Sequence, residues 1–206
     1  MKEIGVLALQ GDFAEHEAAL RHLGVNVRQV RKPEHLAGLE GLIIPGGEST
    51  TLSRLIQDYL FLGPLQKLTA SGVPVWGTCA GMILMAAQVD SLNYPTLGVI
   101  NIAVERNGYG RQVNSFQVQV PVEALGKDPF PAIFIRAPLV AKVGPGVRVL
   151  AQLPREDGID GNKPVIAVRQ GDFLATAFHP ELTEDTRFHE YFLEIVERAG
   201  RKFKGD

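Results

Sequence analysis

The chain has 206 residues, of which 45% are hydrophobic and 21% charged, and this length and composition predict one compact domain over residues 1–206. A formal net charge of −2 without an early run of Lys and Arg excludes the basic footprint of a nucleic-acid-binding protein, and no apolar stretch reaches the roughly 20 residues that cross a bilayer. The single cysteine excludes an internal disulfide and has no neighbouring Cys or His at metal-ligand spacing, so neither a structural metal nor a cofactor is expected.

The first half of the chain alternates apolar runs with segments of helical period. Strands are predicted at 3–9, 25–30, 41–44 and 73–77, and helices at 13–23, within 50–70 and at 80–88. This alternation is typical of βαβ units around a parallel sheet. The chain enters a strand directly, without a charged leader, which predicts a cytoplasmic protein that makes no contact with membranes.

Short polar side chains mark the expected helix starts. Asp12 and Glu15 have the spacing of a capping box before the helix at 13–23. Ser49 and Thr50 are good N-caps for the next helix, and Thr183 can cap a final helix near the C-terminus. Asp12 is therefore interpreted as a structural cap.

The second half is rich in short apolar stretches separated by Gly and Pro turns, which predicts antiparallel hairpins added to the parallel sheet. The stretch 154–162 is longer than a hairpin needs. The strands are expected at 98–105, 113–121, 132–136, 147–153, 164–169 and 172–178.

Three loops that follow predicted strands carry the residues suited to chemistry. They are Leu9–Asp12, Pro45–Ser49 and Gly77–Gly81. The carboxyl ends of parallel strands lie at one edge of a sheet, where open α/β sheets bind their ligands. We therefore expect the three loops to share one site.

Cys79 lies in the pattern Gly-x-Cys-x-Gly between a strand and a helix, which is the form of a nucleophile elbow. Downstream, His179 and Glu181 supply a possible base and the carboxylate that orients it. A thiolate can attack a carbonyl carbon while the imidazole carries protons. The other histidines, at 16, 22, 35 and 189, are interpreted as structural or solvated.

The order of Pro45-Gly46-Gly47, the elbow at 77–81 and His179-Pro180-Glu181 resembles the class I (triad) glutamine amidotransferases. More narrowly, the chain resembles the glutaminase subunits of pyridoxal 5'-phosphate synthase over essentially its whole length. The segments that carry this closer resemblance are 5–13, 46–51, 106–112 and 134–138.

The resemblance implies an α/β fold with three layers, a flavodoxin-like, mostly parallel sheet and added antiparallel hairpins. It implies a glutaminase that hydrolyses L-glutamine to L-glutamate and ammonia through a γ-glutamyl thioester. The ammonia would pass through a protein channel to a separate synthase subunit, which makes pyridoxal 5'-phosphate (vitamin B6). The two subunits would form a hetero-oligomer in which docking activates the glutaminase.

The family's functional positions map onto this chain one by one. The resemblance implies that Cys79 is the nucleophile, His179 the general base and acid, and Glu181 its orienting carboxylate. Backbone N–H groups of Gly47 and Ala80 would bind the oxyanion. The expected glutamine-binding residues are Gly47, Glu48, Ser49, Arg106, Ile135 and Arg136.

Other interpretations remain open at this point. A free cysteine is often a small buried hydrophobic residue, and Gly46-Gly47 is also a common turn. The same fold serves γ-glutamyl hydrolases and amidotransferases of other pathways, for which the partner decides the assignment. A non-catalytic relative whose elbow cysteine senses oxidation is a third reading.

Overall fold

The parallel half of the sheet forms the centre of the molecule. The computed structural model describes residues 2–106, 115–154 and 163–203, so most of the segments 106–112 and 154–162 singled out above lies outside the described residues. Neighbouring strands of this half are all parallel and follow the order of a flavodoxin-like sheet. In spatial order they are β2 (Asn26–Val30), β1 (Glu3–Leu7), β3 (Gly41–Ile44), β4 (Val75–Thr78) and β12 (Phe173–Thr176).

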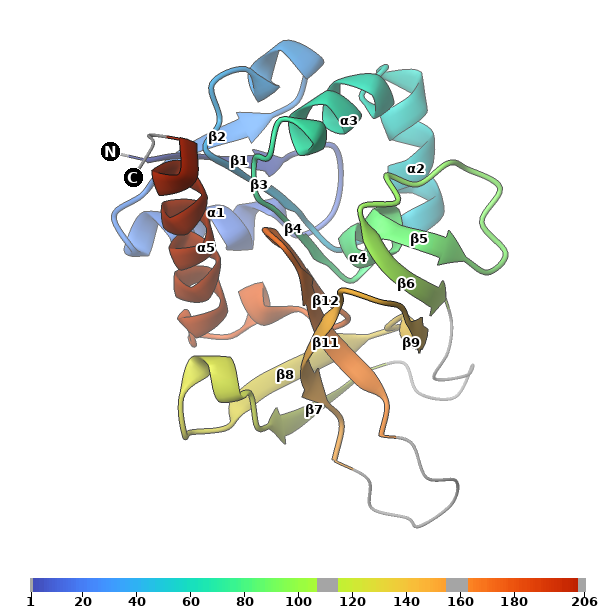
Figure 1. Cartoon of the computed structure of the whole chain (residues 1–206), viewed down its shortest axis with the longest axis vertical. Helices are drawn as coiled ribbons and strands as arrows, with labels where there is room; N and C mark the ends of the chain where they lie inside the picture. Colours follow the sequence, from blue (N-terminus) through green and yellow to red (C-terminus); the bar gives the residue numbers. More distant parts are fainter. Residues whose placement is uncertain (1, 107–114, 155–162, 204–206) are drawn as a thin grey trace.

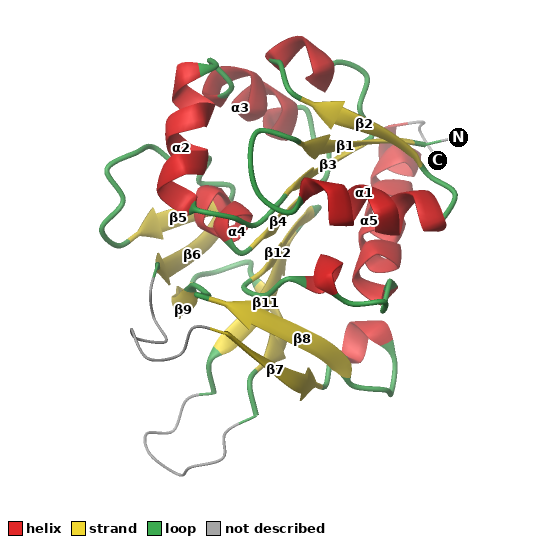
Figure 2. Cartoon of the chain, turned by 180° about the vertical axis from the view of Figure 1, so that it is seen from behind, coloured by secondary structure: helices red, strands yellow, loops and turns green. Residues whose placement is uncertain are grey.

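Helices cover both faces of the parallel strands and make three layers (Figures 1 and 2). One face carries α1 (Phe13–His22) and α5 (Arg187–Phe203). The other carries α2 (Ser49–Asp58), α3 (Leu62–Ala70) and α4 (Ala80–Met85). Side chains alternate across a strand, so Trp76 of β4 packs on the α1 and α5 side while Gly77 faces α4.

Antiparallel pairing extends the sheet beyond β12, as the sequence predicts, except in the last pair at the far edge, which is parallel. The order continues through β11 (Val165–Gln170), β9 (Leu139–Val143), β6 (Ile100–Glu105) and β5 (Ala86–Val89), and β10 (Arg148–Gln152) pairs with β11. A separate hairpin joins β7 (Ser115–Val120) to β8 (Phe130–Ile135). The described strands therefore form a ten-stranded mixed sheet and a two-stranded one.

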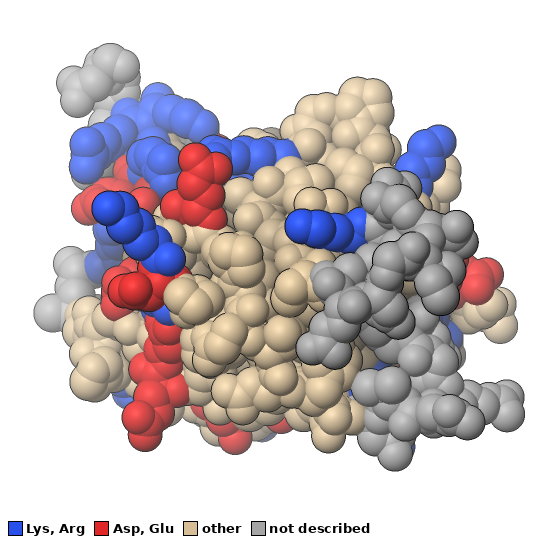
Figure 3. Space-filling model, turned by 90° about the horizontal axis from the view of Figure 1, so that it is seen from below, with Lys and Arg blue, Asp and Glu red and all other residues tan. Residues whose placement is uncertain are grey.

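Three short 3₁₀ helices connect these elements: η1 (Pro33–Leu36), η2 (Glu123–Leu125) and η3 (Pro180–Leu182). Within the described ranges, no helix has the length and apolarity needed to cross a membrane. Seen from below, most of the described Lys and Arg gather beside Asp and Glu toward one side, a few charged side chains lie elsewhere, and uncharged residues fill most of the remaining surface (Figure 3).

The structure corrects three expectations about the elements. The helix expected at 80–88 ends at Met85 and continues as β5, because the apolar run offers no breaker to mark the change. Strand β9 was not expected, since its exposed Lys142 interrupts a short apolar stretch. Helix α5 begins at Arg187, and the Thr183 hydroxyl accepts a hydrogen bond from the Asp185 N–H (3.3 Å) instead of capping the helix.

An aromatic cluster joins α5 to the sheet and to the hairpin. The ring of Phe188 in α5 lies edge-on to Phe130 of β8, with centroids 4.8 Å apart. It contacts Phe178 after β12 at 5.3 Å and stacks near Trp76 of β4 at 6.2 Å. All four side chains are fully buried, so the cluster connects three parts of the fold around the segment that carries His179.

We predict that Phe188→Ala lowers the free energy of unfolding by about 3–5 kcal/mol, because it removes the ring that the other three pack against. Phe188→Leu fills most of the space and should cost less than about 1.5 kcal/mol. Tyr59→Ala, at an exposed position, is the matched control and should change stability by less than about 0.5 kcal/mol. Chemical denaturation measures all three; equal effects of the two Ala variants would contradict the packing argument.

Candidate active site

The ends of four parallel strands bring the expected residues together. Strands β1, β3, β4 and β12 end at one edge of the sheet and lead to Asp12, Gly46, Cys79 and His179 in turn. A Cβ atom on Gly46 would overlap the His179 ring and lie 3.3 Å from the Cys79 Cβ. The loops therefore meet closely enough that only glycine fits between the imidazole and the cysteine.

Cys79 has the backbone conformation of a nucleophile elbow. Its φ of 48° and ψ of −101° are strained for a residue with a side chain, and its N–H donates to the Thr176 carbonyl oxygen (2.8 Å). On either side, a Cβ on Gly77 would overlap the Gly81 backbone, and one on Gly81 would overlap the Ile44 carbonyl oxygen. The two glycines let α4 pack directly on β3 and β4 and hold the turn sharp.

The His179 ring is held by two carboxylates. Its Nδ1 lies 2.8 Å from Glu181 Oε1 and 3.2 Å from Asp12 Oδ2. The Glu181 contact is the one that the sequence predicts, although η3 curves the chain where an extended turn was expected. Since Nδ1 faces the two carboxylates, Nε2 is the nitrogen left for Cys79, whose proximity helps to raise the pKa of His179.

The charges of the site depend on one another. Burial alone would lower the pKa of His179, but hydrogen bonds to Asp12, Cys79 and Glu181 outweigh it and raise the pKa to about 12. Burial raises the pKa of Glu181, and the neighbouring imidazole offsets part of this effect. The hydrogen bond to His179 lowers the pKa of Asp12. An imidazolium between two carboxylates is therefore the favoured state.

Asp12 belongs to the candidate site, a place that its sequence pattern does not indicate. It precedes α1 as expected, but among the described residues its carboxylate makes no capping hydrogen bond and instead reaches His179. The capping-box spacing of Asp12 and Glu15 would be the same whether Asp12 caps the helix or contacts His179. His179 is 167 positions away in the chain. No signal in the sequence near Asp12 could have shown this contact.

The Gly46–Gly47 loop is clamped by the side chain of Gln10. The Gln10 Nε2 donates to the Gly46 carbonyl oxygen (3.4 Å), and Gln10 Oε1 accepts from the Glu48 N–H (3.0 Å). Gly47 has a φ of 136°, and a Cβ there would overlap the Gln10 amide. The clamp fixes the loop that carries one of the two expected oxyanion donors; the other, Ala80, follows Cys79 directly.

Glu48, not Ser49 or Thr50, caps α2. The Glu48 carboxylate accepts hydrogen bonds from the backbone N–H groups of Thr50 (2.9 Å) and Thr51 (2.7 Å). Burial opposes its ionisation, but these hydrogen bonds outweigh burial and lower its pKa to about 2. The expectation of a hydroxyl cap was wrong because the longer Glu side chain folds back onto the helix end.

Arg106 and Ser49, both expected to bind glutamine, form a hydrogen bond with each other. The Arg106 guanidinium donates to Ser49 Oγ (3.1 Å), Thr50 Oγ1 (2.6 Å) and the Ser91 carbonyl oxygen (3.0 Å). It also lies 3.6 Å from Glu48 Oε1. These contacts make Arg106 a brace between β6 and the start of α2, next to the candidate binding loop.

A hollow of about 580 Å³ opens over these residues. Cys79 is 5% exposed and adjoins this hollow through Ile135, whose carbonyl oxygen lies 3.9 Å from the Cys79 Sγ. Arg136, at the end of β8, has a φ of 46°. The lining residues are Asp12, Gly47, Glu48, Ser115, Ile135, Arg136 and His179.

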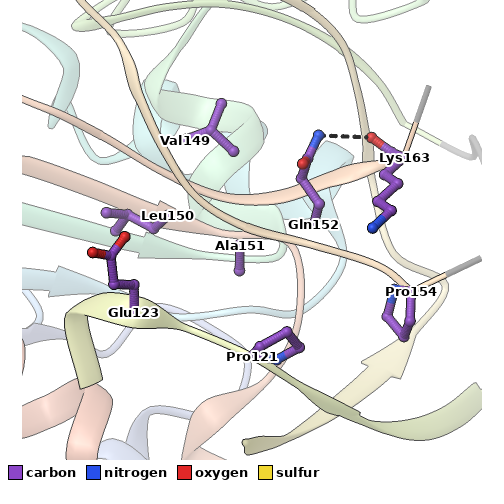
Figure 4. Close-up of a pocket in the computed structure, with 8 residues that line it drawn as sticks. All are labelled: Pro121, Glu123, Val149, Leu150, Ala151, Gln152, Pro154 and Lys163. Carbon is purple, nitrogen blue, oxygen red and sulfur yellow. Dashed lines mark hydrogen bonds between the residues drawn. The ribbon is translucent and has the colours of Figure 1, made fainter. Parts of the chain in front are cut away.

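A second hollow, of about 320 Å³, shares none of these lining residues. It lies between β10 and the chain after β7, and its charged lining residues are Glu123 and Lys163. Figure 4 shows the Gln152 side chain donating to the Lys163 carbonyl oxygen (3.1 Å). It contains no cysteine or histidine, so the first hollow is the candidate active site.

Asp12, His179 and Glu181 are also the described residues whose arrangement could suit a metal ion, with ligand atoms within 4.8 Å of one another. Both carboxylates contact the same His179 nitrogen, Nδ1. A metal ligand nitrogen must be unprotonated, whereas this one is placed to donate a proton to its neighbours. The donor set therefore fits a proton-carrying imidazole better than a metal centre.

Comparison with known proteins shows the family of the chain. Residues 6–198 match the model of the SNO glutamine amidotransferase family. The chain belongs to this family. A relative from Pelotomaculum thermopropionicum, named pyridoxal 5'-phosphate synthase subunit PdxT, is 51% identical over 98% of this chain and 100% of its own length. A protein of the same name from Herpetosiphon aurantiacus is 53% identical over 93% of this chain and 99% of its own.

Solved structures support the same assignment of the fold. A crystal structure described as a glutamine amidotransferase has a TM-score of 0.85 and 48% identity, and it covers 94% of this chain and 98% of its own. The structure of PurLQS from Thermotoga maritima has a TM-score of 0.65 at 16% identity, covering 95% and 99% of the two chains. The latter likeness shows the fold alone. The α/β architecture expected from the sequence is confirmed.

We predict that Asp12→Asn lowers the pKa of His179, because it removes one of two negative charges at Nδ1 while keeping the side chain's size. ¹⁵N NMR of the histidine rings should show His179 losing its proton at lower pH in the variant. The folded-state pKa lies above the usual 6.5, so the stabilisation from these contacts is complete below pH 6.5 and is lost as the pH rises toward about 12. In the Asp12→Asn variant this stabilisation should be lost over a narrower pH range, because the pKa of His179 lies closer to 6.5. Identical titration curves would contradict the role of Asp12.

Proposed function

We propose that this chain is the glutaminase subunit of a pyridoxal 5'-phosphate synthase. It hydrolyses L-glutamine to L-glutamate and ammonia and delivers the ammonia to a separate synthase subunit. The observation that carries the proposal is the His179 ring, held at Nδ1 by buried Glu181 and turned toward the elbow cysteine. The PdxT name of relatives with about half of their residues identical supports the choice of synthase over amidotransferases of other pathways.

In the proposed reaction the Cys79 sulfur attacks the γ-carboxamide carbon of glutamine. The tetrahedral intermediate collapses as His179 gives a proton to the leaving nitrogen, so ammonia departs and a γ-glutamyl thioester remains. Water then attacks the thioester while His179 accepts its proton. The carbon–sulfur bond breaks, glutamate is released, and the Cys79 thiolate and the His179 imidazolium are restored.

Glu181 serves this sequence by holding the ring and by stabilising its positive form. A carboxylate at Nδ1 fixes the tautomer in which Nε2 faces the reacting atoms. Asp12 adds a second negative charge at the same nitrogen, from the side of the hollow. We assign Asp12 the role of a positioning residue for His179.

The developing oxyanion is assigned to the backbone N–H groups of Gly47 and Ala80. Gly47 belongs to the loop that Gln10 clamps, so the direction of its N–H depends on the state of that loop. Docking of the synthase would set this loop and thereby activate the glutaminase. A glutaminase that is active only in the complex would not hydrolyse glutamine when no synthase is present to use the ammonia.

Glutamine would bind in the hollow above Cys79. Its α-ammonium needs acceptors and its α-carboxylate needs donors, and Glu48 and Arg136 supply opposite charges on the lining. The backbone at Gly47 and Ile135 would approach the side-chain amide near the sulfur. Ser49 and Arg106 would act by bracing this wall, since their polar atoms contact each other and the start of α2.

The proposal includes a hetero-oligomer with the synthase subunit, a single glutaminase domain over residues 1–206, and a place in the cytoplasm. No nucleic acid, membrane, metal or cofactor takes part. The reaction needs only glutamine, water and the residues named above.

We predict that Cys79→Ala reduces ammonia release from glutamine by about 10⁴-fold or more, because the thioester can no longer form. His179→Asn should be comparably severe. The assay measures ammonia with and without a pentose-phosphate-utilising synthase, and wild-type release should rise strongly when the synthase is added.

Co-purification with the synthase is the control, since Cys79→Ala should bind the partner as the wild type does. Normal ammonia release by that variant would contradict the assignment of Cys79. No release by the wild type with its synthase would contradict the proposed function as a whole.

A further inference from the structure

The second oxygen of the Glu181 carboxylate points away from His179 into the protein interior. Oε1 is bound to His179, but in the described part of the chain Oε2 makes no hydrogen bond of good geometry and is fully buried. Leaving one oxygen of a buried carboxylate without a donor is unfavourable, because the desolvation of that oxygen is not offset. The polar groups around Oε2 therefore decide how easily Glu181 keeps its charge.

The neighbour of Oε2 is His16 of α1. His16 Nε2 lies 3.3 Å from Glu181 Oε2 and 3.3 Å from Thr78 Oγ1. His16 Nδ1 lies 3.0 Å from Nε2 of His189, in α5. Both histidines are buried, with exposed fractions of 0% for His16 and 1% for His189.

The tautomers of this histidine pair follow from the atoms that lack partners. His189 Nδ1 is buried without a hydrogen-bond partner among the described residues. A buried N–H without an acceptor is rarer than an acceptor without a donor, so the proton of His189 belongs on Nε2. His189 Nε2–H then donates to His16 Nδ1, and His16 must carry its own proton on Nε2, facing Glu181 and Thr78.

Both histidines are neutral in this arrangement. Burial is the main cause that lowers the pKa of His16 well below its usual value, and the positive charge of the nearby His179 lowers it further. Burial lowers the pKa of His189 to about 4. Trp76 packs edge-on against both rings, with centroids 5.4 Å from His16 and 5.0 Å from His189, which leaves them little freedom to turn.

We propose that His16, held in its tautomer by His189, is a positioning residue that directs a neutral N–H toward Glu181 and so keeps the carboxylate charged and aimed at His179. The chain of contacts runs from α5 through α1 to the elbow: His189, His16, Glu181, His179 and Cys79. This inference rests on the proposed glutaminase function, because it assigns His16 a task within that reaction.

The contact has a direct consequence for the reaction. Without the His16 N–H 3.3 Å from Oε2, burial opposes the charge on Glu181 more strongly, and the carboxylate gives less support to the imidazolium. Three titratable groups face His16. They are Glu181 in η3, His179 directly before η3, and His189 in α5. Loss of His16 should therefore weaken catalysis without weakening substrate binding in the hollow.

The test compares His16→Leu with His16→Gln in the complete complex with synthase. His16→Leu removes the donor and should lower kcat for ammonia release roughly 10- to 100-fold with little change in KM. It should also move the alkaline limb of the kcat/KM profile to lower pH, because His179 then loses its proton more readily. His16→Gln can place an amide N–H near the position of Nε2 and should recover most of both effects.

His22→Leu is the matched control, at an exposed position of the same helix, and should leave kcat and the pH profile as in the wild type. His189→Leu should act in the same direction as His16→Leu, but less. Unchanged kcat and pH profile in a folded His16→Leu protein would overturn the inference, as would a defect confined to KM.

A measurement on the wild type keeps the inference testable if His16→Leu does not fold. ¹⁵N NMR of the histidine rings should show His16 and His189 neutral and protonated at Nε2 across the neutral pH range. A proton on His16 Nδ1, or a charged His16, would overturn the proposal. A wild type that releases no ammonia with its synthase would instead contradict the proposed function, and the NMR result would still stand on its own.

Discussion

The hydrogen bond between His179 Nδ1 and Glu181 Oε1, 2.8 Å long, holds a charged pair in a nearly dry interior, and much of the surrounding fold serves it. A buried carboxylate is unfavourable unless its oxygens are paired. Here Oε1 faces the His179 ring and Oε2 faces His16, while the backbone N–H of His179 donates to the Ile133 carbonyl oxygen of β8 (2.8 Å). The pair thus ties η3 to α1 on one side and to the separate hairpin on the other.

Close backbone approach is the second constraint on the site. Three loops from different strand ends meet where a single Cβ atom on Gly46, Gly77 or Gly81 would overlap a neighbour. The positive φ of Cys79 is maintained by this crowding and by the Thr176 contact on the adjacent strand. Glycine at these positions allows the chain to bring the sulfur and the imidazole together at low cost in strain.

The sequence predicted the parts of the site that local pattern determines. The elbow around Cys79 and the pair His179 and Glu181 follow from strand, turn and spacing, and their contacts are present as expected. Asp12 was interpreted as a cap, because its neighbours have capping-box spacing and its true contact is long-range. The sequence likewise indicates only structural or solvated roles for His16 and His189, because 173 positions separate them and the fold brings them together beside Glu181. Strands β5 and β9 were missed where an apolar run had no breaker or a lysine broke the pattern.

The central claim is that Glu181 makes His179 able to activate Cys79. The most direct measurement is the rate at which a chloroketone analogue of glutamine alkylates the protein in complex with its synthase, followed by intact mass and peptide mapping. The Cys79 sulfur displaces chloride and forms a thioether, so one adduct should appear, at Cys79. We expect Glu181→Gln to form it about 100-fold more slowly or worse, since the neutral amide cannot support the imidazolium. Equal rates for the variant and the wild type would contradict the account.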